Sequence, residues 1–565
     1  MGREKTMTMY ERFTGRSRES FQSFEELQRE YNITCGEHFN YAFDVLDVLA
    51  EEQPQNLAML WVSKHNEERR FTFDDMRKLS NQTANFLRNV GVKKGDAVML
   101  VLKRGYQFWY TLLALHKIGA IAVPAPHLLT AKDYVYRLNA AQIAMIIATG
   151  EDDVTHHVQD ALPQCPSVRW LSVTGGNAQG DWLDFDGQVQ LCSETFERPT
   201  GSDANKSTET SLMFFSSGTT GYPKMVCHDY TYPLGHIMTG CFWHRVQKGG
   251  LHFTISDTGW GKSLWGKIYG QWLGESAVFT YDFDRFDAAD ILGKVEKYEV
   301  TTFCAPPTMY RYMIKEDVKR YNFSKLTHCT TAGEALNPEV YYRWEELTGL
   351  KIFEGFGQTE TTLSCLTVYP WMEPKVGSMG LPAPGYKMFI CNENGEGVAP
   401  GTTGEICIKT DESKPFGLFQ HYFNAPEQTL ETWHDGLYHT GDTAYTDEMG
   451  YVWYVGRVDD VIKSSGYRIG PFEVESVLME NPAVLEVAVT GAPDADRGFV
   501  VKATVVLAKG YTPSPQLTLE LQNHVKRNTA PYKYPRIIEY VEELPKTING
   551  KIRRADIRER DGASQ

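Results

Sequence analysis

Short apolar runs alternate with helical segments through the first four-fifths of this chain, and that alternation limits the folds open to it. Residues 96–102 form one such run, and the helix expected before it ends at Gly91. The apolar face of that helix carries Met76, Leu79, Phe86, Leu87 and Val90. Further runs that we interpret as strands occupy residues 120–124, 145–148, 212–215, 301–304 and 351–353. Strands separated by helices favour parallel sheets with crossover connections, so the sequence predicts an α/β fold.

The pattern changes near residue 456. A helix that begins with proline is expected at residues 471–481, followed by two strongly apolar strands at 484–489 and 499–507. A last helix and strand and a charged tail follow, and about a hundred residues suffice for an independent domain. We expect two parts: a large N-terminal domain of crossover-connected sheets with helices, residues 1–456, and a small α+β C-terminal domain, residues 461–565.

Charge and cysteine pattern exclude several classes of protein. The 565 residues carry a formal net charge of −15, which argues against a general nucleic-acid binder. No apolar run is long enough for a transmembrane segment, and the first 30 residues fit neither a secretory signal nor a transit peptide. The ten cysteines are scattered, with no Cys-x-x-Cys pair and no zinc-type spacing with histidine. We therefore expect free thiols and a cytoplasmic location.

A loop rich in glycine and hydroxyl side chains follows the strand expected at 212–215, after a polar stretch, 174–205, that we expect to be a loop. Its glycines permit a tight turn that brings backbone N–H groups close to an anion, and its hydroxyls and lysine add further donors. It lacks the Gly-Lys-Ser/Thr ending of the common P-loop, and a plain turn is the alternative. We favour binding of nucleotide phosphates. The loop comprises Ser216, Ser217, Gly218, Thr219, Thr220, Gly221, Tyr222, Pro223 and Lys224.

Two strand ends carry groups suited to a nucleotide. Residues 354–360 combine an aromatic ring, glycines, a hydroxyl and carboxylates, enough to stack a base, contact a phosphate and hold Mg²⁺ through Glu360. Residues 332–334 form a Gly- and Glu-containing turn after another strand. Each segment, taken alone, is equally compatible with an ordinary strand-to-loop turn.

Three later segments also carry candidate groups. Asp442 follows a Thr-Gly turn and could accept both hydroxyls of a ribose, although an aspartate after glycine is more often a turn residue. Residues 456–469 interleave both signs of charge between glycines, as an interdomain linker would. Lys551 follows a glycine turn near the C-terminus, where a lone lysine is usually solvated surface.

Together, in this order and spacing, these segments resemble the acyl-adenylate-forming superfamily of acyl-CoA synthetases, nonribosomal adenylation domains and luciferases. The resemblance covers residues 43–554, and within the superfamily the chain is most similar to the medium-chain acyl-CoA synthetase group. Segments 257–262, 304–308 and 530–536 support this narrower assignment.

The resemblance implies ATP, Mg²⁺ and coenzyme A as cofactor and co-substrates, and a small-molecule carboxylic acid as substrate. The catalytic residues that it implies are Lys551, Thr359 and Glu360, with Glu360 as the Mg²⁺ ligand. Its implied ATP-binding residues are Ser216, Ser217, Gly218, Thr219, Thr220, Gly221, Lys224, Gly333, Glu334, Glu354, Gly355, Phe356, Gly357, Gln358, Asp442 and Arg457.

In similar enzymes the C-terminal domain is mobile and rotates between two half-reactions. The resemblance places the hinge at residues 457–460, centred on Asp459, and has Lys551 bridge the carboxylate and α-phosphate in the first half-reaction. The coenzyme A contacts that it implies are Ser465, Gly466, Tyr467, Arg468, Arg497, Tyr534, Pro535 and Arg536.

The acyl pocket is implied at Trp260, Gly261, Lys262, Cys304 and Gly357. Gly357 stands where acetate- and propionate-activating relatives carry a bulky tryptophan, so we expect a pocket open to medium-chain, short branched or aryl acids. Trp260 is expected to limit its depth, with ordinary core packing as the alternative. Each buried methylene contributes about 0.8 kcal/mol to such a preference.

Other functions fit the phosphate loop alone. An ATPase or kinase would release ADP, but the missing P-loop ending and the presence of Lys551 oppose it. A catalytically silent nucleotide-binding protein is opposed by the intact Glu360 and Asp442. Within the superfamily, the alternative is a stand-alone adenylating enzyme that loads a phosphopantetheinyl carrier protein.

Overall fold

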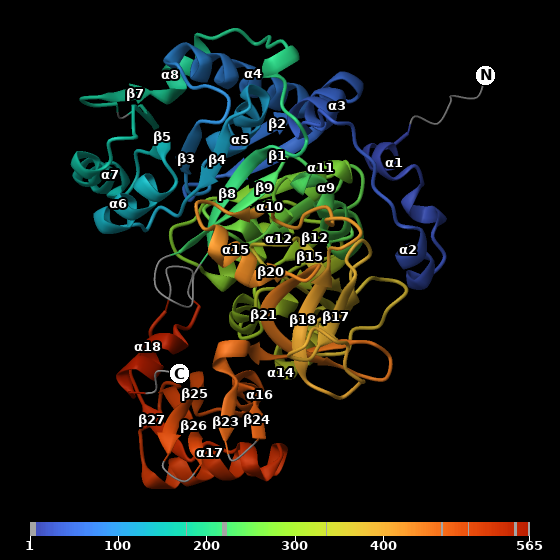
Figure 1. The fold of residues 1–565 in the computed structure, drawn as a ribbon, viewed down its shortest axis with the longest axis vertical. Coiled ribbons are helices and arrows are strands. Elements are labelled where there is room, and N and C mark those ends of the chain that lie inside the picture. Colours follow the sequence, from blue (N-terminus) through green and yellow to red (C-terminus); the bar gives the residue numbers. More distant parts are fainter. Residues whose placement is uncertain are drawn as a thin grey trace.

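The computed structural model describes residues 7–176, 178–216, 223–334, 336–464, 467–494, 497–546 and 551–562. Figure 1 shows a large body that contains the N-terminal and central parts of the chain, and a smaller unit below it formed by the C-terminal residues. The expected α/β class, with a large N-terminal and a small C-terminal domain, is confirmed.

The first large sheet has the strand order β19-β9-β8-β4-β3-β5-β6-β7. From β8 to β7 neighbouring strands run parallel, whereas β9 is antiparallel to β8. Its strands are β3 (Ala97–Val101), β4 (Ile121–Pro124), β5 (Ile143–Thr149), β6 (Trp170–Thr174), β7 (Trp182–Asp184), β8 (Thr210–Ser216), β9 (Lys224–Asp229) and β19 (His421–Tyr422).

The second large sheet has the order β16-β15-β14-β13-β12-β10-β11-β1-β2. Its central strands are parallel, and antiparallel strands stand at both edges. Its strands are β1 (Leu57–Val62), β2 (Glu68–Thr72), β10 (Leu251–Thr254), β11 (Ala277–Tyr281), β12 (Thr302–Cys304), β13 (His328–Thr331), β14 (Ile352–Gly357), β15 (Leu363–Leu366) and β16 (Leu381–Pro382).

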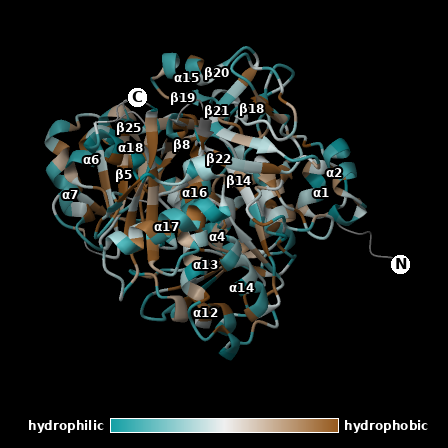
Figure 2. Ribbon diagram, turned by 90° about the horizontal axis from the view of Figure 1, so that it is seen from below, coloured by the Kyte–Doolittle hydropathy of each residue, from teal (hydrophilic) through white to brown (hydrophobic). Residues whose placement is uncertain are grey.

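Helices pack between and around these sheets. The largest buried core joins residues of both sheets with helices α4, α5, α9 and α11, and every residue of α5 is buried. Figure 2 shows hydrophobic colour along the strands and hydrophilic colour on outer helices such as α12 and α14. The helices of this part are α1 (Met9–Thr14), α2 (Phe24–Glu30), α3 (Val48–Glu52), α4 (Phe73–Val90), α5 (Gln107–Ile118), α6 (Ala131–Ala140), α7 (Val154–Ala161), α8 (Phe185–Gln190), α9 (Tyr232–Ile237), α10 (Gly261–Gly266), α11 (Tyr269–Leu273), α12 (Ala288–Lys297), α13 (Pro307–Met313), α14 (Pro338–Thr348) and α15 (Pro426–Thr432).

A third, antiparallel sheet was not predicted from the sequence. It has the order β17-β18-β21-β20, with β22 paired to β21. Its strands are short or only partly buried, so they lack the continuous apolar runs that identify the parallel strands. They are β17 (Met388–Cys391), β18 (Gly404–Lys409), β20 (Trp433–His434), β21 (Leu437–Thr446) and β22 (Val452–Arg457).

The C-terminal sheet has the order β24-β23-β26-β25, with β27 parallel to β26. It has its own core, which includes Val474, Leu478, Val501 and Leu521. The charged tail includes a further helix. The elements are β23 (Ile462–Ser464), β24 (Tyr467–Ile469), α16 (Pro471–Met479), β25 (Val484–Asp494), β26 (Gly498–Leu507), α17 (Pro515–Asn528), β27 (Ile537–Tyr540) and α18 (Arg554–Arg560).

Two sequence expectations are wrong. The stretch 174–205, predicted as a loop, contains β7 and α8. Helix α8 forms because the Asp184 side chain caps its first turn at the Gly187 N–H, and Phe185 and Val189 are buried. The cysteines are not all free thiols, because Cys391 and Cys407 form a disulfide across β17 and β18, whereas the other eight are free.

Among the described residues, none of the helices combines the length and the apolar character that a membrane span requires.

Burial of Lys267, directly after α10, makes the stability of the fold depend on pH. The residue is 2% exposed, and burial, aided by the positive charge of Arg104, lowers the Lys267 pKa to about 7 from 10.5. Between these two values the unfolded chain holds a proton that the folded chain has lost. When the pH is raised from 7 to 10, the thermal unfolding temperature of the wild type should therefore increase relative to that of Lys267→Met.

Lys132→Met is the matched control, because Lys132 is exposed on α6. It should keep the wild-type pH dependence in thermal unfolding scans. If Lys267→Met and wild type show the same dependence, Lys267 does not lose its proton on folding.

Candidate active site

Three parts of the chain that are far apart in the sequence meet at one place: the adjoining ends of β8 and β9, the segment after β14, and the part of β21 next to β22. Ser216 ends β8 and Lys224 begins β9, and the two residues are paired across the strands. Open α/β sheets bind ligands beyond the carboxyl ends of their strands, and Ser216 and Gly357 stand at such ends. Outside the described residues lie the loop candidates Ser217, Gly218, Thr219, Thr220 and Gly221.

The side-chain amide of Gln358 joins the segment after β14 to the antiparallel sheet. Its Nε2 donates hydrogen bonds to the carbonyl oxygen of Thr440, at 2.8 Å, and to Oδ2 of Asp442. Its Oε1 accepts a 2.8 Å hydrogen bond from the Tyr438 hydroxyl. Both ends of the amide are thus satisfied, which fixes its orientation.

Asp442 and Arg457 are cross-strand neighbours on β21 and β22. The Tyr454 hydroxyl donates to Asp442 Oδ1 at 3.1 Å, and Arg457 Nη1 lies 3.4 Å from Oδ2. Burial raises the pKa of the Asp442 carboxyl, whereas Arg457 lowers it. Three neighbours, Gln358, Tyr454 and Arg457, therefore hold this carboxylate in one orientation at a buried position.

Glu360 and Lys224 meet at Tyr422, on β19. The Tyr422 hydroxyl donates a 2.9 Å hydrogen bond to Glu360 Oε1, and Lys224 Nζ lies 4.8 Å from the centroid of the Tyr422 ring. Burial raises the pKa of Glu360, and the positive charges of Arg457 and Lys224 oppose that rise. The Glu360 carboxylate thus lies near two cationic side chains, those of Arg457 and Lys224.

The backbone around Glu360 is also fixed. The carbonyl oxygen of Thr359 lies 2.8 Å from Nε2 of the buried His228, and the Glu360 carbonyl accepts a 2.7 Å hydrogen bond from the Phe419 N–H. These bonds determine how the segment after β14 presents the Thr359 and Glu360 side chains.

Among the implied ATP-binding residues, the resemblance assigns Gly333, Glu334, Glu354 and Phe356 to an adenine shelf. Their surroundings differ. Glu354 is buried, and its carboxylate accepts hydrogen bonds from the backbone N–H groups of Leu336, at 3.0 Å, and Gly377, at 2.9 Å. Burial raises the Glu354 pKa to about 8. The Phe356 ring lies beside the Tyr454 ring, with 6.3 Å between centroids. Glu354 therefore fixes two loops, whereas Phe356 offers an aromatic face.

The other shelf candidates lie close to these residues. Gly333 and Glu334 are exposed after β13, and Glu334 accepts a 2.8 Å hydrogen bond from Thr308. Gly355 is buried within β14 against Leu363.

The acyl-pocket candidates lie on and near α10. Trp260 immediately precedes this helix, Gly261 begins it close to the Thr359 methyl group, and Cys304 is fully buried at the end of β12. Lys262 Nζ donates a hydrogen bond to the Ala332 carbonyl oxygen.

The ammonium group of Lys262 also relates this region to the C-terminal domain. Burial lowers the Lys262 pKa, Cys304 and Glu334 oppose this, and the positive charge of Lys551 adds to the lowering. Lys551 thus contributes to the electrostatic environment of Lys262.

The space beside Gly357 is occupied by atoms of its neighbours. A Cβ atom at this position would stand 2.2 Å from the Thr362 carbonyl oxygen and 2.5 Å from the Trp265 indole. Trp265, on α10, is 6% exposed and fills the space that the missing side chain leaves. An aromatic wall is therefore present, but it comes from another element.

The implied hinge and coenzyme A residues lie in and before the C-terminal domain. Asp459 is in a short 3₁₀ turn, Val458–Asp460, between β22 and β23. Ser465 and Gly466 lie outside the described residues, and Tyr467 and Arg468 are in β24. The Arg497 backbone N–H donates to Asp494 Oδ1 at 2.9 Å, and Arg536 Nη1 donates to the Tyr534 hydroxyl at 2.7 Å, across Pro535.

Sequence reasoning missed four aromatic residues of this site. Tyr438 and Tyr454 stand four and three residues before Asp442 and Arg457, so their strand positions beside the motifs were a usable signal. Tyr422 and Trp265 lie in no motif, and only the folded chain brings them to Glu360 and Gly357.

This arrangement is the one expected of an adenylate-forming enzyme, and comparison with known families agrees. Residues 46–423 match the family model "AMP-binding enzyme", and residues 473–551 match "AMP-binding enzyme C-terminal domain". The chain therefore belongs to the AMP-binding enzyme family, which confirms the resemblance to the acyl-adenylate-forming superfamily.

Similar proteins are acyl-CoA synthetases and CoA ligases. The mitochondrial acyl-coenzyme A synthetase ACSM3 of Homo sapiens is 39% identical over 553 residues, 96% of this chain and 93% of that protein. The mitochondrial ACSM4 of Homo sapiens is 41% identical over 549 residues, 95% of this chain and 93% of that protein. A solved structure of the anthranilate CoA ligase AuaEII in complex with anthranoyl-AMP has a TM-score of 0.85 and 28% identity, covering 94% of this chain and 98% of that one.

The names of these relatives correct one expectation. The ACSM3 and ACSM4 proteins are mitochondrial. The cytoplasmic location expected from the cysteine pattern is therefore wrong.

Because a side chain at Gly357 would overlap the Thr362 carbonyl and the Trp265 ring, Gly357→Ala should lower the free energy of unfolding by about 1–3 kcal/mol. Denaturant unfolding measures this loss. Gly261→Ala is the matched control, since its new methyl group would meet the Thr359 methyl at an ordinary 3.8 Å. Equal stabilities for the two variants would contradict the described packing at Gly357.

Proposed function

We propose that this protein is an AMP-forming acyl-CoA synthetase. In the first half-reaction a carboxylate oxygen attacks the α-phosphorus of ATP, and the bond to the bridging oxygen breaks to release pyrophosphate. In the second, the thiol sulfur of coenzyme A attacks the acyl carbon and displaces AMP. The observation that carries this proposal is the placement of Glu360 near Lys224, and of Asp442 beside Arg457, in a chain that matches this family model.

The site would hold ATP through groups of known position. Ser216 and Lys224 frame the loop proposed for the outer phosphates, Thr359 would contact the α-phosphate, and Asp442 with Arg457 would bind the ribose. Because Gln358 and Tyr454 already orient Asp442, its carboxylate needs little reorganisation on binding. The exposed turn at Gly333 and Glu334, with Phe356, would receive the adenine.

Glu360 fits a Mg²⁺ ligand. Its carboxylate offers the hard oxygen donors that Mg²⁺ prefers, and Tyr422 orients it beside Lys224. When bound there, Mg²⁺ would neutralise charge on the triphosphate. Burial raises the pKa of Glu360 in the free protein, and a bound cation would stabilise its carboxylate form.

The two half-reactions need different groups, and a moving C-terminal domain would supply them. We place the hinge at residues 457–460, around Asp459, between domains 1–456 and 461–565. In the proposed adenylating arrangement, Lys551 would bridge the substrate carboxylate and the α-phosphate. After rotation, the turn at Gly466 with Arg468, Arg497 and Arg536 would receive coenzyme A.

The acid is proposed to be medium-chain, short branched or aryl. Trp260 immediately precedes α10, Trp265 lies within it, and Cys304 ends β12. Flat aromatic walls accept both aryl rings and aliphatic chains. Lys262 is anchored to the Ala332 carbonyl, so its charge is directed toward the backbone.

Lys551→Ala should slow adenylation at least about a hundredfold, because one well-placed donor to a developing charge contributes about 3–4 kcal/mol. The second half-reaction, started from supplied acyl-adenylate, should change far less. Rapid-quench assays of each half-reaction measure both rates. Lys546→Ala is the control, since Lys546 lies close to Lys551 in the sequence and is paired with Glu486. Equal losses in both halves would contradict the role of Lys551.

The proposed overall reaction is tested by its products. With ATP, a panel of carboxylic acids and coenzyme A, the purified protein should release AMP and pyrophosphate in equal amounts and form acyl-CoA. Release of ADP and orthophosphate would overturn the proposal. A protein that acylates a phosphopantetheinyl carrier but not free coenzyme A would favour the alternative acceptor.

A further inference from the structure

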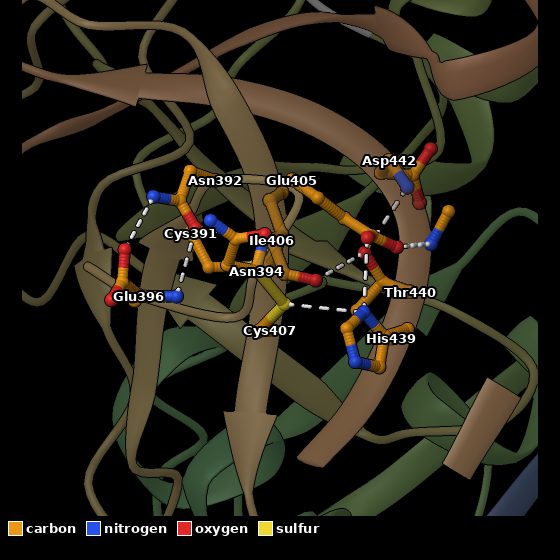
Figure 3. The surroundings of a disulfide bond; sticks show 11 residues. Cys391, Asn392, Asn394, Glu396, Glu405, Ile406, Cys407, His439, Thr440 and Asp442 are labelled. Carbon is orange, nitrogen blue, oxygen red and sulfur yellow. Dashed lines mark hydrogen bonds and ion pairs between the residues drawn. A yellow bond between two sulfur atoms is a disulfide. The ribbon is translucent and has the colours of Figure 1, made fainter. Parts of the chain in front are cut away.

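Four side chains that can ligate metals gather on one face of the antiparallel sheet. Cys391 pairs with Glu405 across β17 and β18, and Cys407 pairs with His439 across β18 and β21. Cross-strand partners share a face, and Glu405 and Cys407 are two residues apart on one strand, so all four project to the same side. Figure 3 shows Glu405 and His439 directed toward each other beside Cys407.

The candidate donor atoms are close together. The sulfurs of Cys391 and Cys407, a ring nitrogen of His439 and a carboxylate oxygen of Glu405 all lie within 4.8 Å of one another. His439 Nδ1 is 3.6 Å from Cys407 Sγ and 3.0 Å from Glu405 Oε2. A tetrahedral zinc site with usual bond lengths requires separations between its ligand atoms of roughly 3.3–3.8 Å. The cluster therefore needs only small side-chain adjustments to surround one ion.

Burial and support also fit a metal site. Cys391 and Cys407 are buried, whereas the side chains of His439 and Glu405 are 17% and 24% exposed, so the cluster has a dry side and an open side. Glu405 Oε1 accepts a 2.8 Å hydrogen bond from the Gly441 N–H, which leaves Oε2 directed at His439. Outer hydrogen bonds of this kind orient ligands in metal sites.

We propose that, with its two cysteines reduced, this cluster binds one Zn²⁺ ion through Cys391, Cys407, His439 and Glu405. Reduction of the Cys391–Cys407 disulfide by a dithiol breaks the S–S bond, gives each sulfur one proton and oxidises the dithiol to its own disulfide. Binding of Zn²⁺ then displaces these two protons. The disulfide and the zinc site are alternative states of one cluster, because both use the same sulfurs.

A disulfide alone does not account for the imidazole and the carboxylate beside its sulfurs. Neither sulfur of a disulfide requires such a neighbour, yet both are present. The sequence shows no zinc-type spacing because strand pairing, not closeness in the chain, assembles this group. A Cys₂-His-carboxylate donor set suits Zn²⁺ better than Mg²⁺ or Ca²⁺.

The site would also support the proposed nucleotide site. The strand register shifts between the pairs Glu405–Thr443 and Cys407–His439, so β21 has more residues than β18 in this stretch. Gly441 and Asp442 lie in this irregular part of β21. Gly441 has φ = +68°, a conformation that glycine adopts readily, and its N–H is held by Glu405. An ion bound to Glu405 and His439 would therefore hold the segment that presents Asp442.

Cobalt binding tests the proposal. The full-length protein is reduced with a phosphine, freed of reductant without air and titrated with Co²⁺, whose bonds to thiolate give a charge-transfer absorption band. The wild type should bind one Co²⁺ per chain with this band, and one Zn²⁺ should displace it. Cys407→Ser and Cys391→Ser should bind at least about a hundredfold more weakly. Cys165→Ser, which replaces a buried thiol outside the cluster, should behave as the wild type.

The wild type alone can overturn the proposal. Circular dichroism establishes that the reduced protein is folded, and alkylation followed by mass spectrometry establishes that Cys391 and Cys407 are thiols. A folded, reduced wild type that shows no thiolate–cobalt band contradicts the site, as does a band that both serine variants retain. A disulfide that resists the phosphine in the folded protein also contradicts it.

Discussion

The hydrogen bonds of one amide, that of Gln358, join the parts of the proposed nucleotide site. This side chain follows a parallel strand of the second large sheet, and its partners Thr440, Asp442 and Tyr438 belong to the antiparallel sheet. An amide with both ends bonded in a partly buried place is costly to move, because its partners would lose bonds that water cannot replace. This contact therefore ties the segment after β14 to the antiparallel sheet.

Around that contact the site concentrates carboxylates and restrains them with neighbours. Asp442 is held by Arg457 and Tyr454, and Glu360 by Tyr422 near Lys224. Burial raises the pKa of both carboxyls. A cation or a hydroxyl group supplied by a bound substrate would stabilise their charged forms. Part of the stability of the free fold is thus given up for a preorganised site.

The sequence predicted the parallel architecture well, because buried strands such as β3 and β5 are continuous apolar runs between helices. It did not predict the antiparallel sheet, whose strands are partly exposed and are defined by pairing between distant residues. Motifs identified Asp442 and Glu360, and also Gln358 and Arg457, but not the tyrosines Tyr422, Tyr438 and Tyr454 that hydrogen-bond to this group. Gly357 is the clearest example of what the sequence does not predict. The space beside this residue of β14 is filled by Trp265, which belongs to helix α10.

If this site joins an acid to the α-phosphate of ATP, an oxygen of the acid must end in AMP. The direct measurement uses a carboxylic acid with heavy oxygen in both carboxyl positions, together with ATP, Mg²⁺ and coenzyme A, and mass spectrometry of the products. The account predicts one heavy oxygen in AMP, one retained in acyl-CoA and none in pyrophosphate. Heavy oxygen in orthophosphate or pyrophosphate, with unlabelled AMP, would contradict it.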